Sequence, residues 1–200
     1  MSTSYAKAET LVGAFVAPTD WLKSAALVVA FSLLTALAAQ VVIPLPWTPV
    51  PLTGQTFAVL LTGALLGSRL GALAMLAYLA EGAMGLPFFR AGAGGVGHLL
   101  GPTAGYLLAF PAAAFVTGLL AERGWDRRFL TAAAAMLLGS FVILAGGWAW
   151  LAFALGSAAR AFQLGVAPFL IGDVVKITLA AALLPAGWAL LGRRRGGQRK

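Results

Sequence analysis

The chain is a series of long apolar segments separated by short polar or glycine-rich stretches. Four of these segments run from about Trp21 to Ile43, Pro102 to Ala121, Phe129 to Leu155 and Val166 to Leu191. About 20 apolar residues in a helix cross the hydrocarbon core of a bilayer, at roughly 1.5 Å per residue. Each segment is therefore predicted to be a membrane-spanning helix.

The region from Thr53 to Met84 is also apolar, but Ser68 and Arg69 interrupt it. We interpret it as two short helices joined by a tight turn, so that four plus two gives six predicted crossings. Before this region, prolines stand at positions 44, 46, 49 and 51, a spacing that no helix tolerates. Residues 44–52 are therefore expected to form an extended loop.

The basic residues indicate the orientation in the membrane. Six crossings put both termini on one side, and placing that side in the cytoplasm leaves only Arg90 and Arg160 outside and Lys176 within a span, so eleven of the 14 basic residues lie inside. We therefore expect a multi-pass protein of the cytoplasmic membrane, with a cytoplasmic arm (1–20), a six-helix domain (21–191) and a basic cytoplasmic tail (192–200). The arm does not have the pattern of a cleaved signal peptide.

Composition supports this class. Hydrophobic residues make up 60% of the chain and charged residues only 10%, which indicates an integral membrane protein in contact with lipid. The net charge of +8 does not predict a nucleic-acid partner, because the basic residues lie at segment ends and in the tail. The chain has no cysteine, one histidine and no P-loop lysine motif, so we expect no metal site, no cofactor and no ATP hydrolysis by that route.

The glycine-rich stretch from Leu86 to Tyr106 is the first candidate for a binding site. It carries Arg90 and the single histidine, His98, and its glycines allow a backbone to approach a ligand closely. Irregular backbone at membrane depth survives where it lines a cavity or is buried in protein. Alternatively, Arg90 is a loop cation that reaches water, and His98 is a hydrogen-bonding loop residue. Residues 92–97 match G-x-G-x-x-G only by coincidence, because no strand precedes them.

Charged side chains within the predicted spans form the second candidate. Asp173 and Lys176 are three residues apart and share a helix face, and Glu81 lies at a comparable depth. Ionisable groups inside a membrane are costly and usually mark function. We expect Lys176 to meet the carboxylate of a small ligand while Asp173 accepts hydrogen bonds from ligand N–H groups. The alternative is a structural ion pair.

Several short blocks follow one another along the chain: Pro49-Val-Pro-Leu-Thr-Gly-Gln-Thr-Phe57, Gly85-Leu-Pro-Phe-Phe89, Gly94-Gly95, Gly101-Pro-Thr-Ala-Gly-Tyr106 and Gly172-Asp-Val-Val-Lys176. In this order they resemble a known family, the biotin-specific substrate-binding (S) components of energy-coupling-factor vitamin transporters, called the BioY family. The resemblance covers nearly the whole chain from about Trp21 to Leu191.

The resemblance implies an all-α integral membrane protein of six transmembrane helices, with an extracytoplasmic pocket capped by loops. It further implies capture of biotin from outside, together with a separate transmembrane coupling (T) component and ATPase (A) subunits. By the same resemblance, Ala26 and Ala30 face the coupling component, where small residues four apart allow close helix approach. Ordinary internal packing of an alanine-rich helix is the alternative.

Biotin also matches the polar groups in these segments. Its carboxylate is expected at Lys176 or Arg90, its ureido N–H groups at Asp173 or Glu81, and its ureido carbonyl at Gln55, Thr53 or a loop N–H. Its apolar ring is expected against Phe88 and Tyr106. The full set of candidate site residues is Asp173, Lys176, Gln55, Arg90, Glu81, Thr53, Phe88, Gly94, Gly95, His98 and Tyr106.

Other function classes remain open. A carrier of the same architecture for another small carboxylate or vitamin would keep the charged pair yet ignore biotin. A membrane enzyme has little support, because His98 has no convincing catalytic partner motif. A purely structural membrane scaffold would bind no ligand. We therefore expect biotin uptake and no enzymatic activity.

Overall fold

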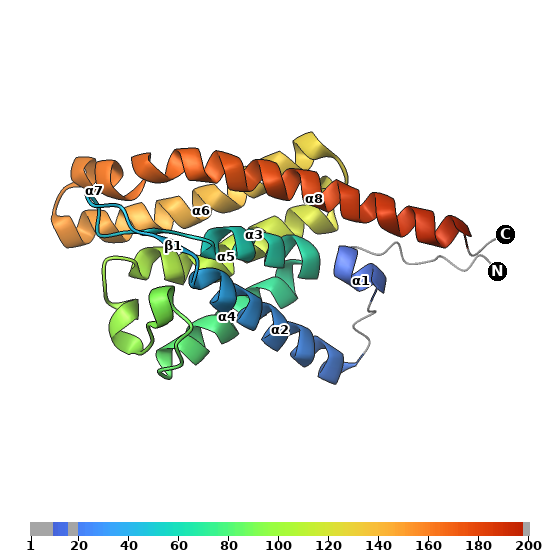
Figure 1. Cartoon of the computed structure of the whole chain (residues 1–200), viewed down its shortest axis with the longest axis horizontal. Helices are drawn as coiled ribbons and strands as arrows, with labels where there is room; N and C mark the ends of the chain where they lie inside the picture. Colours follow the sequence, from blue (N-terminus) through green and yellow to red (C-terminus); the bar gives the residue numbers. More distant parts are fainter. Residues whose placement is uncertain (1–9, 16–19, 198–200) are drawn as a thin grey trace.

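The computed structural model describes residues 10–15 and 20–197, and helices dominate it (Figure 1). The helices are α1 (Leu11–Phe15), α2 (Trp21–Ala39), α3 (Gln55–Leu66), α4 (Ser68–Ala83), α5 (Ala104–Glu122), α6 (Phe129–Leu155), α7 (Ala158–Gly165) and α8 (Leu170–Gly197). Short 3-10 helices are η1 (Arg90–Gly92), η2 (Val96–Leu99), η3 (Trp125–Arg127) and η4 (Ala167–Phe169), and the strands are β1 (Val42–Ile43) and β2 (Leu52–Thr53).

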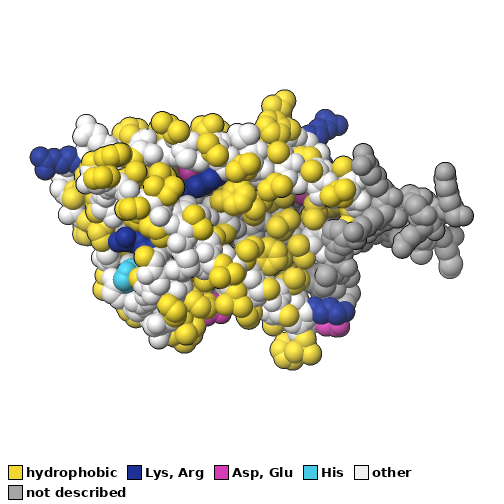
Figure 2. Space-filling model, viewed as in Figure 1, with side chains coloured by type: hydrophobic (Ala, Val, Ile, Leu, Met, Phe, Trp, Pro, Cys, Tyr) yellow, Lys and Arg dark blue, Asp and Glu magenta, His cyan; other side chains and the backbone are white. Residues whose placement is uncertain are grey.

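Within the described residues, four helical stretches are long and apolar enough to cross a membrane. They are Trp21–Ala39, Ala104–Glu122, Phe129–Leu155 and the run Ala158–Leu191, which contains α7, η4 and most of α8. Many large apolar side chains on these helices point outward, and hydrophobic atoms spread over the face seen in Figure 2. A soluble protein would bury such side chains, whereas a bilayer solvates them.

Helix α5 lies at the centre of the bundle and packs against α3, α4 and α6 (Figure 1). Close approach of these helices depends on small residues. A Cβ atom on Gly63 of α3 would lie 2.3 Å from the carbonyl oxygen of Ala114 in α5, and one on Gly105 of α5 would lie 2.4 Å from that of Gly146 in α6. Both crossings therefore bring backbone against backbone, as small-residue motifs do in membranes.

The predicted tight turn joins α3 and α4 at Gly67, whose φ of 88° is in the left-handed region. The carboxylate of Glu122, the last residue of α5, accepts hydrogen bonds from the backbone N–H of Ser68 at 2.6 Å and from its hydroxyl at 2.9 Å. The first N–H groups of a helix have no partner within the helix, and a carboxylate is well suited to satisfy them. One side chain thus ties the α3–α4 turn to α5.

The structure corrects three predicted boundaries. The first span ends at Ala39, and the chain then enters a two-stranded antiparallel sheet, β1 with β2, that closes the proline-rich loop at its base. The stretch that carries Arg160, which the sequence predicts as a connection between the spans ending at Leu155 and starting at Val166, is helix α7. The last span starts at Leu170 rather than Val166, and α8 continues through part of the segment expected to be a tail. Lys7 of the expected arm lies outside the described residues.

Candidate functional site

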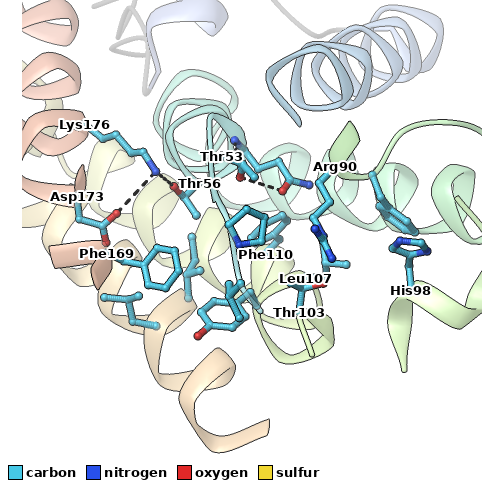
Figure 3. A pocket seen from close by; sticks show the side chains of 17 residues that line it. Thr53, Thr56, Arg90, His98, Thr103, Leu107, Phe110, Phe169, Asp173 and Lys176 are labelled. Atoms are coloured by element: carbon cyan, nitrogen blue, oxygen red, sulfur yellow. Dashed lines mark hydrogen bonds and ion pairs between the residues drawn. The ribbon is translucent and has the colours of Figure 1, made fainter. Parts of the chain in front are cut away.

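A cavity of about 50 Å³ lies among α3, α5, α6 and α8. It is bordered by the loop that precedes β2, through Val50 and Pro51, and by the glycine-rich loop between α4 and α5. Aromatic side chains form much of its wall, including Phe89, Phe110 and Phe169 (Figure 3). The polar residues that line it are Thr53, Gln55, Thr56, Arg90, His98, Thr103, Asp173 and Lys176.

The ion pair of α8 forms one end of the cavity. Lys176 Nζ lies 3.9 Å from Asp173 Oδ1, and both side chains are largely buried, at 19% and 11% exposure. Two other helices hold the pair in place. Lys176 donates to the Thr56 hydroxyl of α3 at 2.7 Å (Figure 3). The Ser140 hydroxyl of α6 donates to Asp173. Asp173 and Lys176 therefore share a helix face, which confirms the prediction, and their opposite charges compensate each other at this end of the cavity.

Arg90 and His98 lie away from that pair, on the side of the cavity made by the glycine-rich loop (Figure 3). Within the described residues, no carboxylate lies within 4.0 Å of the Arg90 guanidinium, and its buried Nε atom makes no hydrogen bond. The His98 ring packs against the Phe89 ring at a tilt of 33°, with ring centroids 6.0 Å apart. This end therefore offers one positive charge that no acidic side chain compensates.

Gln55 and Thr53 line the cavity between these two ends. The Thr53 hydroxyl donates to Gln55 Oε1 at 3.0 Å, and Gln55 Nε2 donates to the Tyr78 hydroxyl at 2.5 Å. Tyr78 in turn donates to the backbone carbonyl of Phe88 at 3.0 Å. The amide of Gln55 keeps one further N–H and one lone pair, so it can both donate to and accept from a ligand.

Tyr106 contributes its ring to the cavity, but its hydroxyl is already engaged. It donates to the carbonyl oxygen of Gly165 in α7 at 2.6 Å, a bond that ties α5 to α7. Gly147 of α6 lets the ring approach, since a Cβ atom there would lie 2.1 Å from the ring. Tyr106 therefore lies where the sequence predicts an apolar wall.

Four candidates from the sequence do not line this cavity. Phe88 is half-buried, and Phe89 beside it, 1% exposed, provides the aromatic wall instead. Glu81 is half-buried on α4, and one of its carboxylate oxygens has no partner among the described residues. Gly94 packs against the carbonyl of Leu86, and Gly95 donates its N–H to Gly82 at 2.7 Å, so both shape the loop.

Several residues of the site were not predicted from the sequence. Thr56, Thr103, Phe110 and Phe169 line the cavity, and Ser140 reaches Asp173 from behind. Thr56 and Thr103 fall inside the sequence blocks quoted for the family resemblance, so those blocks carried a usable signal. The remaining three are uncharged residues of apolar helices and carry none.

Comparison with known proteins identifies the family. Residues 6–193 match the model of the BioY family. The chain belongs to the BioY family. A protein of Pyrococcus horikoshii named probable biotin transporter BioY is 45% identical over 161 residues, covering 80% of this chain and 93% of that protein. A biotin transporter BioY of Thermotoga maritima is 40% identical over 153 residues, covering 76% and 88%. The chain is therefore a membrane protein of a transporter family.

A solved structure supports the fold. A crystal structure of the S-component for biotin from an ECF-type ABC transporter matches with a TM-score of 0.75, covering 82% of this chain and 90% of the other, at 24% identity. The helical arrangement described above is thus that of an S-component of this transporter class. Among the described residues, no group of three or more His, Cys, Asp or Glu side chains is placed to hold a metal ion.

Proposed function

We propose that this chain captures biotin outside the cytoplasmic membrane as the substrate-binding component of an energy-coupling-factor transporter. The observation that carries the proposal is the 45% identity to a protein named probable biotin transporter, over 93% of that protein's length. The cavity supports it, because it combines apolar walls with a few convergent polar groups, which is typical of small-molecule sites.

The chemistry of the two ends suggests how biotin lies in the site. The Asp173–Lys176 pair presents an acceptor beside a donor, which matches the N–H and carbonyl groups of the ureido ring. Arg90 presents a cation without an acidic partner, which matches a carboxylate. We therefore place the ureido ring against α8 and the carboxylate at Arg90, with the apolar ring between Phe89 and Tyr106.

Binding requires the cavity to grow. Sites for drug-sized ligands usually enclose roughly 300 Å³ or more, whereas this cavity measures about 50 Å³. Lys176 can swing away from Thr56 to free space at one end, but the aromatic walls are packed tightly. We propose that the loops 44–51 and 86–101 move outward to admit biotin and close over it afterwards.

The membrane arrangement is also part of the proposal. We infer six crossings, α2 to α6 and α8, with both termini in the cytoplasm and the two loops on the outer face. The basic residues at the inner ends of the apolar segments support this orientation. Ala26 and Ala30 are exposed on α2, where a helix of the coupling component would meet them, and ATPase subunits bound to that component would supply the energy.

Calorimetric titration of biotin into the detergent-purified chain tests the proposal. We expect tight one-to-one binding, with much weaker binding of other small carboxylates such as lipoate. Asp173→Asn and Lys176→Ala variants, checked for folding, should both lose tight binding because each breaks the same end of the site. A folded wild-type chain that ignores biotin but binds another carboxylate would assign a different substrate to the same architecture.

A further inference from the structure

Gln40, the residue that follows α2, bonds across to the loop that carries Arg90. Its Oε1 atom accepts a hydrogen bond from the backbone N–H of Gly92 at 2.8 Å. Its Nε2 atom donates to the carbonyl oxygens of Pro87 and Phe89, both at 3.4 Å, and to that of Ala36 in its own helix at 2.8 Å. One amide therefore holds backbone groups on both sides of Arg90.

The loop held in this way forms part of the cavity wall. Phe89 is 1% exposed and packs edge-on against Tyr78, with ring centroids 5.7 Å apart, and Arg90 lines the cavity beside it. Moving this loop away would remove an aromatic wall and a cation together. Movement of this loop would therefore enlarge a cavity that is too small for its ligand, and we call the loop the gate of the cavity.

The backbone at the same place is strained. Ala91 has a φ of 54°, the only left-handed residue other than glycine in the described part of the chain, and Gly92 follows with a φ of 75°. A left-handed alanine costs about 1–2 kcal/mol and persists only where surrounding contacts fix it. Two backbone bonds within the loop bracket this residue, from the N–H of Ala93 to the carbonyl of Arg90 at 3.1 Å and from the N–H of Phe89 to the carbonyl of Ala93 at 2.8 Å. The bond from Gly92 to Gln40 ties the same strained turn to the end of α2.

We propose that Gln40 is a positioning residue that holds the gate of the cavity shut. Among the described residues, its side-chain hydrogen bonds go only to backbone groups of residues 87–92 and of its own helix, and it does not line the cavity, so it acts through Phe89 and Arg90 rather than on the ligand. We call the hydrogen bonds from Gln40 to residues 87–92 the latch. Without the latch, the loop should open more often. Ligand should then both bind and dissociate faster.

The test measures access to the cavity without any ligand. The chain has no cysteine, so Leu107→Cys introduces a single thiol in the cavity wall at a position that is 4% exposed. The labelling rate of this thiol by a water-soluble methanethiosulfonate reports how often the loop opens. Three proteins are compared: Leu107→Cys alone, Leu107→Cys with Gln40→Ala, and Leu107→Cys with Gln163→Ala. Gln163→Ala is the control, because it removes an exposed glutamine of α7.

Gln40→Ala should raise the labelling rate about tenfold, the value of roughly one net hydrogen bond, and Gln163→Ala should leave it unchanged. Equal rates in all three proteins would overturn the latch. Stopped-flow measurement of labelled biotin should give faster association and dissociation for Gln40→Ala by similar factors.

Gln40→Glu should give a pH-dependent labelling rate, which a merely structural role of Gln40 would not produce. When protonated, its acid group keeps one O–H donor and a carbonyl acceptor, against the two N–H donors and one acceptor of the amide, and so restores the latch in part. When ionised, it only accepts and faces the carbonyls of Pro87 and Phe89. The ratio of its labelling rate to that of Gln40→Ala should therefore fall as the pH is lowered from 7 toward 4.5. A ratio that does not change with pH contradicts the proposed geometry.

The measurement of biotin kinetics rests on the proposed function, whereas the measurement of thiol labelling does not. If the wild-type chain fails to bind biotin but the labelling rates differ as expected, the substrate assignment fails and the latch stands. If biotin binds tightly and labelling is the same in every variant, the latch fails and the substrate assignment stands.

Discussion

Replacing Arg90 by glutamine tests which end of the cavity receives the carboxylate of biotin. Arg90 has no carboxylate within 4.0 Å among the described residues, whereas Lys176 is 3.9 Å from Asp173 and 2.7 Å from Thr56. A ligand carboxylate thus gains more from Arg90 than from a lysine whose charge is already compensated. Biotin amide, which lacks the charge but keeps the ring system, is the matched ligand for this test.

The expected size follows from the value of a hydrogen bond to a charged group, about 1.5–3 kcal/mol, which is roughly tenfold to 150-fold in affinity. Wild-type protein should bind biotin amide more weakly than biotin by this factor. Arg90→Gln should bind biotin about as weakly as the wild type binds the amide. The two changes should not add, because each removes the same interaction.

Isothermal titration of both ligands into wild type, Arg90→Gln and Arg160→Gln gives the full cycle. Arg160 is exposed on α7 and does not line the cavity, so its variant controls for the loss of a positive charge. The reasoning is refuted if Arg90→Gln weakens biotin and biotin amide equally. Loss of the discrimination in Lys176→Met instead would reverse the proposed orientation.

Three further predictions concern binding and stability. Ser140→Ala removes the hydroxyl that donates to Asp173 and should weaken biotin binding about tenfold in calorimetry, without changing the melting temperature by more than a few degrees; unchanged affinity would show that Asp173 needs no such support. Gly67→Ala should destabilise the protein by about 1–2 kcal/mol in thermal unfolding, because the residue has a φ of 88° and its new methyl group would approach Glu122; an unaltered melting temperature would contradict this. Burial in η3 raises the pKa of Asp126, although hydrogen bonding to an indole N–H and a neighbouring arginine lower it in part. The folded chain therefore binds this proton more tightly than the unfolded chain does, and the contribution of Asp126 to stability should decline as the pH rises from about 4 through the raised pKa. Melting curves of Asp126→Asn should lack that decline, and identical pH profiles would count against it.

Local features of this fold could be predicted from the sequence. Helix α6 has the predicted bounds Phe129–Leu155, because length and hydropathy alone define a span. The contact between Asp173 and Lys176 follows from their three-residue separation on a helix. The turn at Ser68 was recognisable because polar residues interrupt an apolar region.

Contacts between distant segments could not be predicted in this way. Ser140 lies 33 residues before Asp173, and Gln40 lies 52 residues before Gly92, and no charge or spacing marks either pair. Phe89 rather than Phe88 lines the cavity because of the conformation of the loop. Irregular backbone has no repeating pattern of side-chain directions, so the sequence does not show which of the two faces the cavity.

Helix α7 stands where the sequence predicts only a connection between two spans. Gly156 and Ser157 interrupt the apolar pattern, but Ser157 accepts a hydrogen bond from the backbone N–H of Arg160 at 3.4 Å and so starts a new helix. Glycine followed by serine is compatible with a loop or with a helix start, and only the tertiary contacts of the following residues decide between them.

The charges of the cavity have a consequence for transport against a membrane potential. Asp173 and Lys176 cancel one another, so the cavity without biotin carries the single positive charge of Arg90 when histidine is counted as neutral, and biotin would bring it to zero. A charge moved across a membrane changes in energy by about 2.3 kcal/mol per 100 mV. If the whole site reorients during transport, a potential that is negative inside leaves the loaded step inward unaffected. The same potential opposes the outward return of the unloaded site, which carries one positive charge. Turnover would therefore slow with increasing potential, while biotin release would not.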